Sequence, residues 1–275
     1  MRTRRLCVTL FALGLLAAGC GAGQPADRAS PSPSPRPASS TPASAAAPGV
    51  TIRYEGNAQV EVSLNGGARV LIDVYDPSAL SAPPTADDIL LTTHTHDDHV
   101  SRDFQKGFPG RRLFVMEGRI HTPDATITSI ASAHTEDDPL VPRNGTDYIF
   151  IIDMGGLRIA HFGDIGQAAL TTGQLKAIGS VDIAVTQFEN SFSHMDATNK
   201  KGFRLMEQVK PRLVIQTHTS PAAVQYAATL WPVLVSARPS VTVTAADLPA
   251  ETSLLLLGDD AAFYAETVGA AKVDW

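Results

Sequence analysis

Short apolar runs alternate with polar or glycine-containing segments through most of the chain from Thr51 onwards. Runs of this length that are rich in Val, Ile and Leu predict β-strands. Turn signals separate neighbouring runs, as Asn65-Gly66-Gly67 and Met154-Gly155-Gly156 do. The predicted strands are 51–54, 59–64, 70–74, 89–92, 113–116, 126–131, 148–153, 157–161, 183–186 and 213–216.

Two segments have the pattern of helices. In the first, Asp196 can act as the N-cap, apolar residues recur at a spacing of three up to Val209, and Pro211 prevents continuation. The second predicted helix covers 221–230. Many strands with interspersed helices predict an α/β sandwich, in which two sheets carry helices on the outside.

The first 19 residues differ from the rest of the chain. Three arginines precede an almost wholly apolar stretch at 6–18, which is the layout of a secretory signal peptide and is short for a transmembrane span. The ending LAAGC resembles a bacterial lipobox, whose cysteine is lipidated; a plain signal peptide is the alternative. The other cysteine, Cys7, lies in the part removed, so no disulfide is expected. We predict an exported lipoprotein, anchored at the extracytoplasmic face of the cell membrane through Cys20.

Residues 20–48 are rich in Pro, Ser and Ala and contain no large apolar side chain. Such a segment buries too little surface to offset its ordering entropy, so we predict a disordered tether. One folded domain is then expected at 49–275.

Removal of the leader (1–19) leaves 19 basic residues against 28 acidic ones, a net charge of −9. This charge argues against nucleic acid as a partner.

Three of the eight histidines lie in THTHDDHV at 93–100, directly after an apolar run. His94, His96, Asp98 and His99 form the pattern H-x-H-x-D-H. Side chains two apart on a strand point the same way, so His94 and His96 can approach one ion. Imidazole and carboxylate groups are ligands that zinc accepts, whereas a solvated loop has no need of this spacing. The motif therefore predicts a metal site.

Three later polar residues occupy equivalent places along the chain. His134, Asp164 and His218 each stand just past the C-terminal end of a predicted strand. Open α/β sheets commonly build their sites at that edge. Each residue alone could be an ordinary loop residue, but together with the first motif they predict one shared site.

These motifs resemble those of the metallo-β-lactamase fold hydrolases. The matching elements are Asp73 in VLIDVYDP, THTHDDH, His134 in SAHTED, Asp164 in HFGD and His218 in IQTH. Their order is that of the family, and MDATN and KPRLVIQTH extend the resemblance to its ascorbate-6-phosphate lactonase-like branch. The resemblance implies an α/β fold: an αββα sandwich of two mixed β-sheets with helices on the outer faces.

The resemblance also implies a ligand set for two divalent metal ions. Two triads would each hold one ion: His94, His96 and His134 for the first, and Asp98, His99 and His218 for the second. Asp164 would bridge the ions, and Asp73 would brace the ligand loop from behind. Zinc is the simplest choice, with manganese and iron left open because N and O ligands suit several metals.

The implied activity is hydrolysis of an ester, lactone or phosphodiester bond in a small-molecule substrate. A hydroxide shared by the metals would attack the carbon or phosphorus, and Asp98 would orient it or move its proton. An anionic substrate is compatible, because the ions supply positive charge. β-Lactam hydrolysis is disfavoured, because the best-known zinc β-lactamases carry a cysteine where this chain has Asp164.

Two other functions stay open. The chain could be a non-catalytic metal-binding surface lipoprotein. The complete ligand set argues against this, because a protein that had lost catalysis would usually have lost some of the ligands. It could also be a di-iron redox enzyme of the same fold, although the sequence contains no rubredoxin-like cysteine segment. Metal analysis and a turnover assay would separate these readings.

The sequence defines the roles of the remaining histidines and of Asp97 less well. His194 in NSFSHMD lies on a loop expected to border the metals, where it is a candidate contact for an anionic substrate or the leaving group. His161 is expected to pack behind the site and His121 to lie at the surface. Asp97 receives no ligand role.

Overall fold

The computed structural model describes residues 48–140 and 145–273. These all belong to the second of two compact units, Ala45–Trp275. The predicted signal peptide, Cys20 and the tether up to residue 47 lie outside the described residues. Within the described part, each helix is too short or too polar to cross a membrane.

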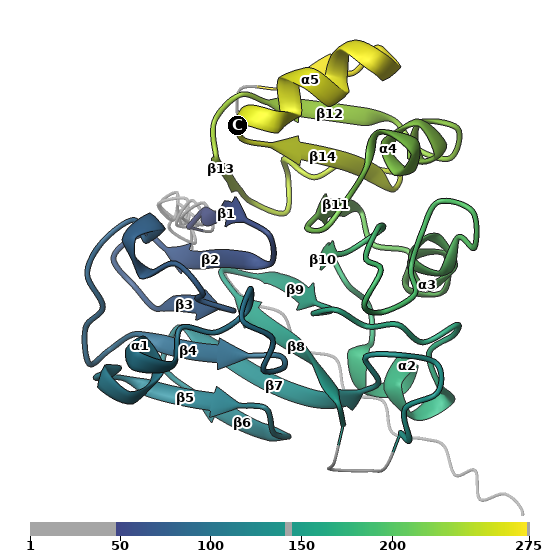
Figure 1. The fold of residues 1–275 in the computed structure, drawn as a ribbon. Coiled ribbons are helices and arrows are strands. Elements are labelled where there is room, and N and C mark those ends of the chain that lie inside the picture. The colour runs from purple at the N-terminus through teal and green to yellow at the C-terminus, as the bar shows by residue number, and fades with distance from the viewer. Residues whose placement is uncertain (1–47, 141–144, 274–275) are drawn as a thin grey trace, which may run out of the picture. The chain divides into compact units, whose positions relative to one another are not determined.

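Two mixed β-sheets form the centre of the described domain (Figure 1). The first sheet contains β1 (Val50–Gly56), β2 (Gln59–Leu64), β3 (Arg69–Ile72), β4 (Ile89–Thr92), β5 (Arg111–Phe114) and β13 (Ser240–Val243). Their spatial order is β13-β1-β2-β3-β4-β5. The pairs β3–β4 and β4–β5 are parallel, and the other pairs are antiparallel.

The second sheet has nine strands in the order β15-β12-β14-β11-β10-β9-β8-β7-β6. They are β6 (Gly118–His121), β7 (Ala125–Ser132), β8 (Asp147–Met154), β9 (Leu157–His161), β10 (Ile183–Thr186), β11 (Leu213–Gln216), β12 (Val233–Ser236), β14 (Ser253–Leu257) and β15 (Ala271–Lys272). The pairs from β6 to β9 are antiparallel, and those from β9 to β15 are parallel.

Helices lie on the outer faces of both sheets (Figure 1). They are α1 (Arg102–Gly107), α2 (Thr172–Ile178), α3 (Lys201–Val209), α4 (Pro221–Ala228) and α5 (Asp259–Val268), with a 3-10 turn at Pro77–Ala79. Phe104 of α1 packs with residues of the first sheet. The other four helices contribute to an apolar cluster on the second sheet.

Side-chain alternation along the strands explains this layering. Leu91 in β4 and Phe150 in β8 belong to one buried cluster between the sheets. Leu90 points the other way, towards α1, while Ile149 and Ile151 join the cluster under the helices. Strands buried on both faces need apolar residues at every position, which is why these runs are continuous. The predicted αββα sandwich is confirmed.

Several predicted boundaries differ from the observed ones, and two of these differences have a clear physical reason. The strand expected at 113–116 is β5, two residues earlier, because its sheet-edge position lets exposed Arg111 and Arg112 belong to it. The helix expected to start after Asp196 starts at Lys201. Asp196 instead accepts the backbone N–H groups of Thr198 and Asn199 at 2.7 Å each, which closes a separate turn before the helix.

Candidate metal centre

The predicted ligands lie on loops that leave the C-terminal ends of strands in both sheets. These loops carry His94, His96, Asp98 and His99 after β4, His134 after β7, Asp164 after β9 and His218 after β11. In the second sheet β9 and β11 both pair in parallel with β10, while β7 and β9 both pair antiparallel with β8. The strands β7, β9 and β11 therefore end at one edge of the sheet, as the sequence predicted.

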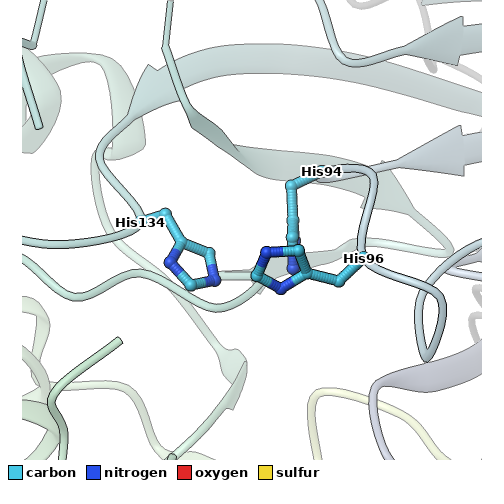
Figure 2. A group of neighbouring side chains, drawn as sticks. All are labelled: His94, His96 and His134. Carbon is cyan, nitrogen blue, oxygen red and sulfur yellow. The ribbon is translucent and has the colours of Figure 1, made fainter. Parts of the chain in front are cut away.

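Potential ligand atoms converge there in three overlapping groups, each with its atoms within 4.8 Å of one another. The groups are His94, His96 and His134; His94, His99 and Asp164; and Asp98, His99 and His218. Figure 2 shows the first group, with the imidazoles gathered between two loops. The first and third groups have the membership that the resemblance implied, and the second places Asp164 between them.

The distances around Asp164 suit shared cations. Its Oδ2 atom lies 3.1 Å from Nε2 of His99 and 3.8 Å from Nε2 of His94. Its Oδ1 atom lies 3.4 Å from Nε2 of His218. Two ligands of a tetrahedral ion at about 2.1 Å are about 3.4 Å apart. The observed separations therefore leave each pair of atoms within reach of a common ion.

Three polar atoms at this point are buried and have no hydrogen-bond partner among the described residues. They are Nε2 of His94, Nε2 of His134 and Oδ1 of Asp164. Buried polar atoms are nearly always paired, because leaving one unpaired costs about 1–3 kcal/mol. Bound cations would supply the missing partners, so the residues fit a metal centre.

The electrostatics of the site favour the protonation states that bind metals. Burial lowers the pKa values of His96, His134 and His218 below the usual histidine value, which keeps their lone pairs available. Burial alone would raise the pKa of Asp164, but the hydrogen bond and charge of His99 hold it well below its usual range. Asp164 is therefore a carboxylate.

His99 is held differently from the other histidines. Its Nδ1 atom lies 2.9 Å from Oδ2 of Asp73. Asp73 also accepts the N–H and hydroxyl of Thr93 at 2.8 and 2.7 Å. Burial would lower the pKa of His99, but the charges of Asp73 and Asp164 raise it well above 6.5. Asp73 thus holds one nitrogen of the ring while the other faces Asp164.

Sequence reasoning missed two residues that hold Asp164 in place. Asp147, fully buried at the start of β8, accepts the N–H of Asp164 at 3.2 Å and the hydroxyl of Ser132 at 2.7 Å. It also lies 3.5 Å from Nδ1 of His94. Asn190 donates from Nδ2 to Oδ2 of Asp164 at 2.6 Å. The sequence gives only a weak indication of either role. Asp147 is an acidic residue at the start of an apolar run, and Asn190 is an amide residue shortly after a predicted strand.

Cavities border the ligands on two sides. One, of about 360 Å³, is lined by His94, His96 and His134 together with Phe192. The other, also about 360 Å³, is lined by His218 and Glu189 among others. Phe192 is 71% exposed, and its ring centroid lies 5.8 Å from that of His96. A small molecule could therefore reach the ligands from either side.

The remaining sequence candidates lie around this centre. His194 is exposed and has a left-handed backbone (φ +51°), and Phe192 is the residue of the same loop that lines the cavity. His161 is fully buried, and its Nδ1 atom accepts the N–H of Gly163 at 3.2 Å. His121 is exposed at the end of β6, and exposed Asp97 lies 3.8 Å from Arg102.

Comparison with known families gives a match across most of the domain. A family described as "Beta-lactamase superfamily domain" matches residues 51–218, which include all the ligands discussed above. A comparison with curated protein sequences found no match.

Solved structures with a similar fold are distant in sequence. A proposed Zn-dependent hydrolase of the metallo-β-lactamase superfamily from Thermotoga maritima is 16% identical, with a TM-score of 0.56 over 76% of this chain and 98% of that chain. Igni18, a metallo hydrolase from Ignicoccus hospitalis, is 19% identical, with a TM-score of 0.45 over 62% and 83%. An isothiocyanate hydrolase from Delia radicum gut bacteria is 15% identical, with a TM-score of 0.45 over 66% and 92%. The first of these similarities supports the fold alone.

Proposed function

This chain belongs to the β-lactamase superfamily, and on that premise we propose that it is a hydrolase dependent on two divalent metal ions, most simply zinc. The observation that carries the proposal is the pair of ligand triads that meet at Asp164. Each triad offers three N or O atoms, and three protein ligands with an open position are typical of catalytic zinc. The three unpaired buried atoms at the same point support bound cations.

When bound, two such ions would lower the pKa of a bound water and polarise the bond to be cleaved. The protein's own part is to position groups. Asp98 is half-buried and belongs to the triad with His99 and His218, so its second carboxylate oxygen can orient a water or accept its proton. Asp73 and Thr93 hydrogen-bond to the Nδ1 atoms of His99 and His94 at 2.9 and 3.1 Å, which limits the rearrangement needed during turnover.

The proposed substrates are small molecules with an ester, lactone or phosphodiester bond. Hydrolysis of p-nitrophenyl butyrate and of bis(p-nitrophenyl) phosphate by the purified domain tests this directly. We expect turnover of at least one, its loss with a chelator, and its recovery with zinc, manganese or iron. A protein that holds metal but turns over neither compound would be a binding protein instead, and an iron-loaded protein that consumes oxygen without hydrolysing either compound would indicate redox chemistry.

The two adjacent aspartates provide a matched pair of variants. Asp98→Asn should lower kcat by about two orders of magnitude or more, because an amide cannot accept the proton. Asp97→Asn changes an exposed neighbour outside the three ligand groups and should leave kcat unchanged. Equal effects of the two substitutions would contradict the role proposed for Asp98.

We further propose that the protein is exported and held at the membrane by a lipid on Cys20. The basis is the sequence: a basic and apolar leader, the LAAGC ending and a Pro/Ser/Ala-rich tether. Expressed in full in a bacterial host, the protein should partition into the detergent phase of Triton X-114. Cys20→Ser should move it to the aqueous phase, and a detergent-phase serine variant would contradict lipid attachment at Cys20.

A further inference from the structure

Phe192 is a large apolar side chain held in an exposed position next to the first triad. It is 71% exposed, and its ring centroid lies 5.8 Å from that of His96. Single exposed apolar residues are common on soluble proteins, so exposure alone assigns no role. Two further observations set Phe192 apart. Its backbone is fixed by hydrogen bonds to buried groups, and its side chain lines a cavity together with the histidines of the triad.

The loop that carries Phe192, residues 190–195, is held by hydrogen bonds at its base. Asn190 and Met195 exchange backbone hydrogen bonds of 2.7 and 2.9 Å. Oδ1 of Asn190 accepts the N–H of Phe192 at 2.9 Å, while Nδ2 of the same amide donates to Oδ2 of Asp164 at 2.6 Å. One amide therefore links the backbone of Phe192 to the residue at which the two proposed triads meet.

Two other side chains hold Ser193, the next residue of the loop. The ammonium of Lys201, a residue only 3% exposed, donates to the carbonyl of Ser193 at 3.3 Å and to that of Gly166 at 3.0 Å. The amide of Gln187 donates to the hydroxyl of Ser193 at 2.8 Å. Buried hydrogen bonds of this kind resist local opening. The ring of Phe192 is therefore exposed on a firmly held loop.

Val115 provides a second apolar side chain in the same cavity. It follows β5 of the first sheet, is half-buried, and has a left-handed backbone (φ +48°). This conformation is strained for a β-branched residue, and such strain is typical of binding sites, where the surroundings hold it in place. Here the N–H of Val115 donates to the carbonyl of Thr92, the last residue of β4, at 3.0 Å. The first sheet thus contributes Val115 to the cavity, and the second contributes Phe192.

The rest of the cavity lining is polar and includes proposed metal ligands. It consists of the imidazoles of the first triad (Figure 2) and of Thr95, Thr135, Asp138 and Thr146. Oδ2 of Asp138 accepts the N–H of Thr135 and the hydroxyl of Thr146 at 2.9 Å each. Ligand sites commonly combine apolar walls with a few polar groups that set orientation. A substrate in this cavity can therefore present an oxygen to the proposed ion and its hydrocarbon to Phe192 and Val115.

We propose that Phe192 and Val115 form an apolar wall that binds a hydrocarbon group of the substrate next to the scissile bond. The protein would then prefer esters and lactones that carry an aromatic or branched apolar group. The assignment rests on the proposed hydrolase function and narrows its substrate class. Phe192 would contact the substrate without taking part in bond cleavage, so its removal should change the preference among substrates rather than abolish hydrolysis.

Three small esters test this preference. Methyl acetate has no phenyl group, whereas the isomers methyl phenylacetate and benzyl acetate carry one on the acyl half and on the alcohol half, respectively. We expect kcat/KM of the metal-loaded protein to be about tenfold or more higher for at least one isomer than for methyl acetate. Phe192→Ala should lower that ratio about three- to tenfold, because the phenyl group loses its aromatic partner.

Comparing the ratio between variants cancels the intrinsic reactivities of the esters. The matched control is Phe263→Ala, which removes another exposed phenylalanine, on α5 and outside the cavity, and should leave the ratio unchanged. Equal kcat/KM for all three esters in the wild type, or the same ratio in the wild type and Phe192→Ala, would overturn the proposal. The isomer whose turnover depends on Phe192 identifies the half of the substrate that contacts the ring.

Binding of two hydroxamates makes the test independent of turnover. Acetohydroxamate and 2-phenylacetohydroxamate share a metal-binding group, differ by one phenyl group and contain no ester bond. Calorimetry with the metal-loaded protein should show binding of the phenyl compound that is tighter by about tenfold. Phe192→Ala should remove most of this difference, and Val115→Thr should reduce it, because a hydroxyl replaces a methyl group of the wall. Equal affinities for the two compounds in the wild type, or an unchanged difference in Phe192→Ala, would overturn the proposal.

The combined outcomes separate the two levels of the account. A preference for the phenyl hydroxamate that depends on Phe192, together with no turnover of any ester, would refute the hydrolase and leave the apolar wall intact. Metal-dependent turnover with a phenyl preference that Phe192→Ala does not change would refute the apolar wall and leave the hydrolase intact.

Discussion

Oδ2 of Asp73 lies 2.9 Å from Nδ1 of His99, and neither side chain has any exposure to solvent. This contact keeps a proton on Nδ1 of His99, because Nδ1–H must donate to the carboxylate, while Nε2 faces Asp164. Asp73 adopts a left-handed backbone (φ +51°) directly after β3. Strain of this kind persists where the surroundings hold it in place, here through Thr93.

Asp73→Asn should therefore weaken metal binding without touching a proposed ligand. Loss of an outer carboxylate that orients a metal-bound histidine typically costs about 10- to 100-fold in metal affinity. Competition with a chromophoric chelator would measure the change. Asp153→Asn alters a half-exposed aspartate on β8 and serves as the control. Equal affinities in the two variants would show that Asp73 does not act on the metals.

Metal binding should release protons near neutral pH. In the metal-free protein the pKa of His99 is well above 6.5, because Asp73 and Asp164 outweigh the effect of burial. A metal must displace that proton to use Nε2, so affinity should rise as the pH increases from about 6 to 8. Titration calorimetry in two buffers of different ionisation enthalpy gives the number of protons released. Affinity that is flat with pH would contradict the assignment of His99 as a ligand.

Two glycines with positive φ angles test how tightly the ligand loop is packed. Gly163 (φ +55°) directly precedes Asp164, and an added Cβ would collide with Oδ1 of Asp147 and approach Cβ of Thr93 to 2.8 Å. Gly163→Ala should lower metal content and the Tm together. Gly156 (φ +81°) has no atom within 4 Å of its added Cβ. Gly156→Ala should cost only about 1–2 kcal/mol of backbone strain and retain the metals.

The sequence predicted the centre of the fold better than its edges. Five predicted strands match β2, β4, β9, β10 and β11 residue for residue. These strands lie inside their sheets, and β4, β10 and β11 each begin with three consecutive apolar residues. The edge strand β6 was missed because half of its residues are exposed. β14 lies outside the predicted set, although its buried run SLLLL is typical of a strand.

The site was predictable where its residues form a local motif. His94, His96 and Asp98 are close in sequence, and each later ligand follows a strand end. Asp147 could not be identified in the same way, because its contact with His94 joins the start of β8 in the second sheet to the loop after β4 in the first. Contacts of that kind depend on how the two sheets pack together, which the local sequence does not specify.

Away from the metal centre, Glu55 should make stability depend on pH. Burial, and then the neighbouring carboxyl of Glu61, raises the pKa of Glu55 from 4.5 to about 8. A group that binds its proton more tightly in the folded state stabilises the fold at low pH, and that stability is lost as the pH rises from about 4.5 to about 8. The Tm of the wild type should therefore fall over this range relative to that of Glu55→Gln.

The matched control for this effect is Glu251→Gln, which changes an exposed glutamate. Its Tm should follow that of the wild type at every pH. If the Tm values of the wild type and of Glu55→Gln change with pH in parallel, the pKa of Glu55 is the same in the folded and the unfolded protein, and the prediction fails.

The central claim is that two triads joined by Asp164 hold two metal ions. Metal content per chain, measured by plasma mass spectrometry after loading and desalting, tests it most directly. The account predicts two divalent ions per chain in the wild type and a lower content in both His134→Ala and His218→Ala, since each removes a ligand from a different triad. Less than one ion per chain in the wild type, with hydrolytic activity unchanged in His96→Ala, would contradict the account.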